Sequence, residues 1–185
     1  MKKKLYFTLS ALGILGLLLS GCRSDQDGTE GEEPMAQESN TEANQQKVEI
    51  GEKAPTFKLE SLDGEVYRLD EMQGTPVLLS FFGVNCSYCR DEMVDLNKLY
   101  MEKSDEAAVL LVNVGDQREQ VESFVEEYGL EMPVLMDSDI KVSLSYNVSA
   151  VPYNMVVDEE GIIRAIKLGP MGYEEMKSQL ESAGE

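Results

Sequence analysis

Apolar and polar residues alternate in patterns that predict strands and helices in turn along the chain. Residues 57–59 and 66–69 alternate apolar and polar positions on either side of Asp63-Gly64, which is typical of a β-hairpin. Residues 77–82 and 109–114 are almost entirely apolar, as expected of strands that are buried on both faces. These segments therefore predict a hairpin followed by two buried strands.

Two helices are predicted around the second buried strand. The first opens at Cys86 and places an apolar stripe at Cys89, Met93, Leu96 and Tyr100. The second has its inner face at Val121, Phe124 or Val125, and Tyr128, and Gly129 is expected to end it.

The last third of the chain predicts further short elements. A strand over residues 134–136 precedes a helix over 140–146, for which Ser138 or Asp139 is the expected N-cap. Residues 153–157 and 162–167 predict a second hairpin, and a final helix presents Tyr173, Met176 and Leu180. Strands that alternate with helices favour the α/β class, here a three-layer sandwich with a mixed central sheet.

The first residues have the pattern of an export signal. Three lysines follow Met1, and residues 5–19 form an almost unbroken apolar run, which is shorter than the roughly 20 residues that span a bilayer. The run ends in Leu19-Ser20-Gly21-Cys22, which resembles the bacterial lipobox, whose cysteine is lipidated and becomes the first mature residue. An uncleaved anchor helix is the alternative, and both interpretations place the remainder outside the cytoplasm.

Composition separates a tether from a globular domain. Residues 23–47 are polar and acidic, so they bury too little apolar surface to offset the entropy of ordering and are expected to be a disordered spacer. We therefore expect a signal peptide over residues 1–21, the lipidated Cys22 and an acidic tether over 22–47, and one domain over 48–185.

Charge and residue content exclude several functions. The 185-residue chain has no histidine, which excludes a Ser-His-Asp triad and any zinc site with a histidine ligand. Acidic residues outnumber basic ones by 35 to 16, so nucleic acid and anionic lipid headgroups are not expected partners.

The segment Cys86-Ser87-Tyr88-Cys89 is the candidate for chemistry, because it follows a buried strand and opens a helix. A helix N-terminus stabilises a thiolate and lowers its pKa, so Cys86 is expected to be the exposed nucleophile and Cys89 the shielded resolving thiol. Ser87 and Tyr88 are expected to tune the redox potential and to contact substrate. A zinc site lacks further ligands, and a structural disulfide across so short a loop contributes only about 2 kcal/mol.

Residues 77–93 resemble the active-site segment of the thioredoxin superfamily. The opening residues 51–57 and the Leu62-Asp63-Gly64 turn are similar to its TlpA/ResA branch, whose members are extracytoplasmic and often membrane-anchored. The resemblance covers roughly residues 48–180. It implies a thioredoxin fold with an N-terminal hairpin and a central insertion, and dithiol–disulfide exchange with protein substrates, without a cofactor or metal.

Two further sites follow from this resemblance. Val151-Pro152 matches the family's cis-proline, which implies that the backbone of Val151 pairs with a substrate peptide. Glu92 matches an acidic residue of ResA-like proteins and is a candidate to exchange a proton with Cys89. A solvated glutamate favoured by the helix dipole is the alternative.

The chain also departs from the family pattern. Asn85 stands where most relatives have tryptophan, and it is a candidate N-cap of the helix. Ser80 occupies the position of thioredoxin's buried acid, so the resemblance gives no proton relay from that side.

The ResA-like branch mostly reduces disulfides in apocytochromes c or other exported proteins, and similar lipoproteins serve methionine sulfoxide reductases. Reduction outside the cytoplasm needs electrons, which implies a membrane thiol transporter of the CcdA or DsbD kind as donor. A peroxiredoxin-like thiol peroxidase is an alternative, but Gly83 and Leu79 replace the threonine and proline of its Pro-x-x-x-Thr-x-x-Cys pattern. A second alternative is a non-catalytic, lipid-anchored binding module.

Lipidation of Cys22 is tested by labelling cells that express the chain with a radioactive fatty acid. The wild-type protein should take up the label and the Cys22→Ala variant should not, because the thiol is the only attachment point that the lipobox offers. Uptake of label by Cys22→Ala would contradict the assignment.

Overall fold

The computed structural model describes residues 47–184, and these begin with the expected hairpin. Strand β1 (Lys58–Glu60) pairs antiparallel with β2 (Val66–Arg68), with Leu59 opposite Tyr67. A 3-10 helix, η1 (Leu69–Glu71), follows directly. The hairpin is tied to the main sheet at its far edge, because Leu62 N–H donates to the carbonyl of Val134 at 2.9 Å.

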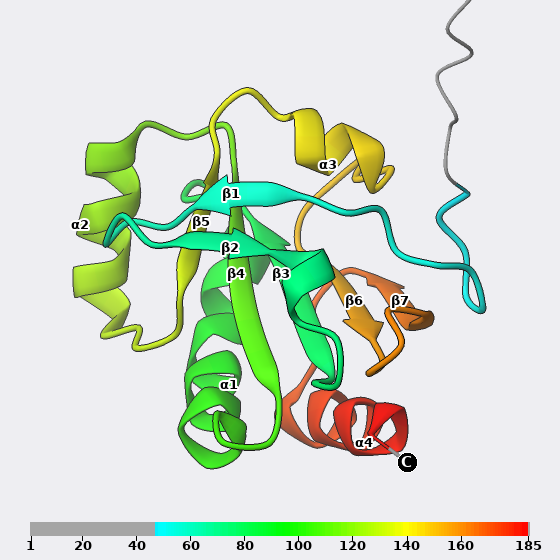
Figure 1. Ribbon diagram of the computed structural model, residues 1–185. Helices are drawn as coiled ribbons and strands as arrows, with labels where there is room; N and C mark the ends of the chain where they lie inside the picture. The colour runs from blue at the N-terminus through cyan, green and yellow to red at the C-terminus, as the bar shows by residue number, and fades with distance from the viewer. Residues whose placement is uncertain (1–46, 185) are drawn as a thin grey trace, which may run out of the picture. The chain divides into compact units, whose positions relative to one another are not determined.

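The main sheet has five strands in the order β5-β4-β3-β6-β7. Their bounds are β3 (Val77–Phe82), β4 (Ala108–Val114), β5 (Val134–Asp137), β6 (Tyr153–Val157) and β7 (Ile163–Leu168). Strands β3, β4 and β5 run parallel, whereas β6 is antiparallel to both β3 and β7 (Figure 1). The mixed central sheet predicted from the sequence is confirmed, and β3, whose six residues are all buried, lies at its centre.

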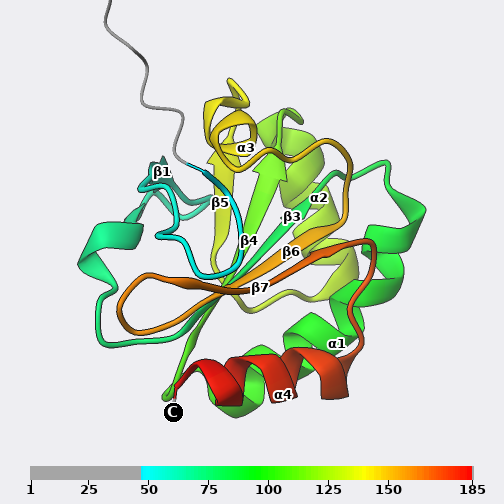
Figure 2. The same ribbon diagram turned by 90° about the vertical axis from the view of Figure 1, so that its right-hand side faces the viewer.

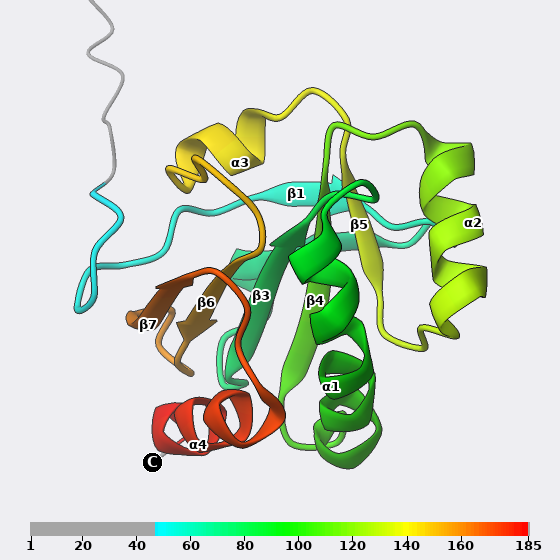
Figure 3. The same ribbon diagram turned by 180° about the vertical axis from the view of Figure 1, so that it is seen from behind.

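Helices and the hairpin form the outer layers. The helices are α1 (Ser87–Lys103), α2 (Arg118–Tyr128), α3 (Lys141–Ser145) and α4 (Tyr173–Ala183). Buried side chains of α1, α2 and α4 share one core cluster, whereas α3 and the β1–β2 hairpin belong to the cluster on the opposite face of the sheet. Figures 2 and 3 show these layers from the side and from behind.

Alternate residues of β3 supply both cores, as the two-residue repeat of a strand requires. Leu78 and Phe82 face the α1 layer, and the Phe82 ring lies 5.3 Å from that of Phe124. Leu79 and Phe81 face the hairpin layer. A strand that is buried on both faces therefore carries its last residues straight into the segment that opens α1.

Two helix starts differ from the sequence predictions. Asn85 is exposed and is not the cap of α1; Cys86 takes that position, and its sulfur accepts a hydrogen bond from the N–H of Cys89. Neither Ser138 nor Asp139 is the N-cap of α3; Ile140 takes that position in the left-handed conformation, and the buried carboxylate of Asp137 accepts from Val142 N–H at 3.2 Å and Ser143 N–H at 2.7 Å. The predicted end of α2 is confirmed, since Gly129 adopts the left-handed conformation.

The proposed export signal, Cys22 and the tether, apart from Lys47, lie outside the described residues. Between Lys47 and Gly184, none of the helices has the length and apolar character needed to cross a bilayer.

Candidate active site

Cys86 and Cys89 form a disulfide at the start of α1, with their Cα atoms 5.3 Å apart. Cys86 is the N-cap and is partly exposed, whereas Cys89 has no exposed surface. The backbone N–H of Cys89 donates to Cys86 Sγ at 3.1 Å. One sulfur of the pair is thus reachable from solvent, and the other lies behind it in the core.

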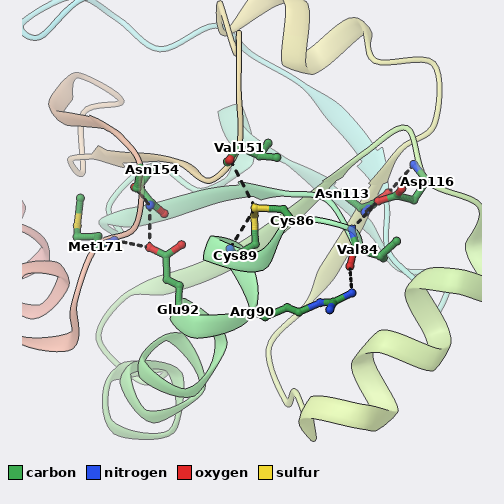
Figure 4. Close-up of a disulfide and its surroundings, with 11 residues drawn as sticks. Val84, Cys86, Cys89, Arg90, Glu92, Asn113, Asp116, Val151, Asn154 and Met171 are labelled. Atoms are coloured by element: carbon green, nitrogen blue, oxygen red, sulfur yellow. Dashed lines mark hydrogen bonds between the residues drawn. A yellow bond between two sulfur atoms is a disulfide. The ribbon is translucent and has the colours of Figure 1, made fainter.

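The segment before β6 faces the exposed sulfur. The Val151–Pro152 peptide bond is cis, and the carbonyl oxygen of Val151 lies 3.5 Å from Cys86 Sγ (Figure 4). Pro152 is buried, and its own carbonyl accepts from Gly169 N–H at 2.8 Å. Residues that are 65 positions apart in the chain therefore meet at this point, as the family resemblance implies.

Ser87 and Tyr88 occupy the first turn of α1 between the two cysteines. Both are exposed, and 64% of the surface of Tyr88 is accessible. A large aromatic side chain in the open beside a disulfide is available to a docking protein.

Glu92 is buried one turn beyond Cys89, with only 2% of its surface exposed. Its Oε1 accepts from Met171 N–H at 2.7 Å and from Asn154 Nδ2 at 2.8 Å, and within residues 47–184 its Oε2 has no partner. Burial raises the pKa of this carboxyl to about 7, against the opposing effect of both hydrogen bonds and of the Lys167 charge. The alternative of a solvated glutamate is therefore wrong.

The loop that leads into Cys86 is fastened at Val84. The N–H of Val84 donates to Asp116 Oδ2 and its carbonyl accepts from Arg90 Nη2, both at 2.9 Å. Asp116 is in turn held by Asn113, whose Nδ2 donates to Asp116 Oδ2 at 2.8 Å and whose Oδ1 accepts from Asp116 N–H at 3.0 Å. These bonds fix the backbone just before the exposed cysteine.

Sequence reasoning missed the residues that support the site. The residues missed are Arg90, Asn113, Asp116, Asn154 and the backbone of Met171. Asn113 and Asn154 each interrupt an otherwise apolar strand, and such a polar residue in a buried run was the available signal. Arg90, Asp116 and the Met171 backbone carried no comparable signal, because their partners become neighbours only in the folded chain.

The arrangement suits the exchange of one disulfide for another. An external sulfur can approach Cys86 from solvent, while Cys89 can close on Cys86 only from the protein side. A carboxyl with a pKa near 7 lies on the same side of α1 as Cys89, three residues further along the helix. The fold and the site together define a thiol–disulfide oxidoreductase.

Known proteins agree with this class. The chain belongs to the AhpC/TSA family, whose model matches residues 50–166. It is 37% identical over 136 residues to the thiol-disulfide oxidoreductase ResA of Geobacillus kaustophilus, an alignment that covers 73% of this chain and 78% of ResA.

Solved structures share the fold, and the predicted thioredoxin fold is confirmed. The thiol:disulfide interchange protein DsbE of Chlorobium tepidum superposes with a TM-score of 0.69 at 22% identity, covering 75% of this chain and all of that one. The pneumococcal exposed lipoprotein thioredoxin Etrx1 of Streptococcus pneumoniae gives a TM-score of 0.62 at 28% identity, over 69% and 99% of the two chains.

Burial of Glu92 predicts a pH dependence of stability. The folded protein keeps a proton on Glu92 up to about pH 7, whereas the unfolded chain loses it near 4.5, so the free energy of unfolding should fall as pH rises between these values. The loss amounts to about 3 kcal/mol. Urea unfolding of the oxidised protein between pH 4 and 8 should show this decline, and Glu92→Gln should remove it.

The matched control is Asp91→Asn, which neutralises the exposed neighbouring acid on the same helix. It should keep the wild-type decline. Equal declines in wild type and Glu92→Gln would show that Glu92 does not titrate in this range.

Proposed function

We propose that this oxidoreductase works outside the cytoplasm, is anchored to a membrane by lipid on Cys22, and reduces disulfides in exported proteins. The asymmetric burial of the Cys86–Cys89 disulfide at the start of α1 carries the proposal. Such an arrangement lets a protein substrate reach one sulfur only, so that capture and release fall to different cysteines.

In the proposed reaction the reduced pair donates two electrons. The Cys86 thiolate attacks a substrate disulfide, a mixed disulfide forms, and one substrate sulfur leaves as a thiolate. Cys89 then loses its proton and attacks Cys86 Sγ, which releases the second substrate sulfur and forms the Cys86–Cys89 disulfide. The substrate leaves as a dithiol, and the two electrons it gained came from the cysteine pair.

Two groups around the sulfurs have proposed roles in these steps. The N–H of Cys89, 3.1 Å from Cys86 Sγ, supports the attacking thiolate. Glu92 accepts the proton of Cys89, because a carboxyl with a pKa near 7 can bind and release a proton at neutral pH.

Substrate recognition is assigned to the surface around Cys86. The carbonyl of Val151, beside Pro152, pairs with the substrate backbone next to the disulfide that is attacked. Ser87 and the exposed ring of Tyr88 contact substrate side chains on the other flank.

The direction and the partners rest on the likeness to ResA-like proteins. Apocytochrome c and methionine sulfoxide reductase are the candidate substrates, and a membrane thiol transporter of the CcdA or DsbD kind is the candidate electron donor. The location rests on residues 1–22, with residues 1–21 as signal peptide, residues 22–47 as lipidated tether and residues 48–185 as the catalytic domain. A similar solved structure is that of an exposed lipoprotein, which agrees with this location.

Reduction of insulin disulfides by dithiothreitol tests the activity. The wild-type chain should accelerate precipitation of insulin, and Cys86→Ser should fall to the uncatalysed rate, because it lacks the sulfur that solvent can reach. Cys89→Ser is the matched control, since it keeps the attacking sulfur. Once reduced, freed of dithiothreitol and then mixed with insulin, it should accumulate a mixed disulfide that added dithiothreitol releases.

Two other outcomes would replace the proposal. Rapid consumption of hydrogen peroxide without insulin reduction would indicate a thiol peroxidase. Inactivity of the wild type towards both insulin and peroxide would indicate a binding module.

A further inference from the structure

Asn154 is a polar residue buried in the middle of the apolar strand β6. It has no exposed surface and stands opposite Ser80 in the ladder with β3, on the sheet face that α1 covers. Its Nδ2 donates to Glu92 Oε1 at 2.8 Å and to the carbonyl of Gly169 at 3.3 Å. Its Oδ1 is buried and has no partner within residues 47–184.

The hydrogen bonds that Glu92 receives suit its ionised form. Oε1 accepts two N–H groups, from Asn154 and from the backbone of Met171, and a carboxylate offers only acceptors. A protonated Glu92 has an O–H that needs an acceptor. Met171 N–H can only donate, whereas a primary amide has both a donor and an acceptor end.

Rotation of the Asn154 amide by 180° exchanges its two ends. Oδ1, which is unpartnered in the observed orientation, would then face Glu92 and accept a hydrogen bond from its O–H, while Nδ2 would leave the carbonyl of Gly169. One side chain can thus serve both protonation states of Glu92 without movement of β6.

Charged groups near Glu92 do not take this role. Asp95 on α1 and Lys167 on β7 act on Glu92 through their charge. On the side of the disulfide, the group that can titrate once the pair is reduced is Cys89 on α1. Asp95 accepts from Tyr173 N–H at 3.1 Å, and Lys167 is paired with Glu175. Within the described part of the chain, Asn154 is the side chain that is hydrogen-bonded to Glu92 (Figure 4).

We propose that Asn154 is the positioning residue of Glu92, whose amide donates to the ionised carboxylate and, turned over, accepts from the protonated acid. The carboxyl therefore stays in place beside Cys89 while it gains and loses a proton. This inference rests on the proposed role of Glu92 in proton exchange with Cys89.

The test follows the titration of Glu92 directly, by carbon-13 NMR of the side-chain carboxyl in the full-length oxidised chain in detergent. The signal is assigned by its loss in Glu92→Gln. Asn154→Leu removes the bond to either form of Glu92, but a hydrogen bond to the charged carboxylate is stronger than one from the neutral acid, so the titration midpoint should rise by about one pH unit. Met155→Leu is the matched control, because it changes the next residue of β6, which faces the opposite core, and should leave the midpoint unchanged.

A second variant tests the same contact through charge repulsion instead of the loss of a hydrogen bond. Asn154→Asp is nearly isosteric but places a second carboxyl against Glu92, so the pair should titrate in two steps, with the upper midpoint above the wild-type value. Glu92 titrating in a single step at the wild-type midpoint in either Asn154 variant would overturn the inference.

The pH profile of mixed-disulfide release by Cys89 links the titration to the reaction. In Asn154→Leu the midpoint of this profile should rise with that of Glu92. A shifted NMR titration with an unshifted release profile would uphold the contact between Asn154 and Glu92 but overturn the proposed proton transfer from Cys89. An unshifted NMR titration would overturn the Asn154 inference alone and leave the proposed function standing.

Discussion

At the start of α1 the sulfur of Cys86 accepts a hydrogen bond from the backbone N–H of Cys89, and the rest of the site depends on this N-cap interaction. A helix leaves its first N–H groups without internal partners, so a sulfur at the N-cap meets a donor and the positive end of the helix dipole. The same geometry sends Cys89 into the core one turn later. Central strand β3 fixes where the helix begins, and the bonds of Val84 to Asp116 and Arg90 hold the connecting backbone.

Burial gives the two faces of this first turn different chemistry. The outer face presents Cys86, Ser87 and the exposed Tyr88 to a macromolecular partner, close to the carbonyl of Val151. The inner face encloses Cys89 and Glu92 among apolar side chains, where a carboxylate is costly and its pKa rises to about 7. The core around Cys89 therefore also holds a carboxyl with a pKa near 7, three residues further along the helix.

The elements and the cysteine pair were predictable because their signals are local. Continuous apolar runs identified the strands, and the bounds predicted for β3 and β6 agree with those observed. The N-caps of α1 and α3 were predicted wrongly. Cys86 takes the first although Asn85 has the better capping propensity, and Ile140 takes the second without a side-chain cap, because the buried carboxylate of Asp137 binds N–H groups of the first turn instead. Burial of Glu92 depends on β6 and on the segment before α4, at least 62 residues away, which no local pattern encodes.

The central claim is that one sulfur is open to attack and the other is shielded, and brief alkylation of the reduced full-length chain measures this directly. Protein reduced with dithiothreitol is pulsed with a limiting amount of iodoacetamide, quenched, and digested for mass spectrometry of the peptide that contains both cysteines. The account predicts modification at Cys86, with Cys89 labelled only after unfolding in urea. Equal labelling of both cysteines in the folded protein, or preferential labelling of Cys89, would contradict it.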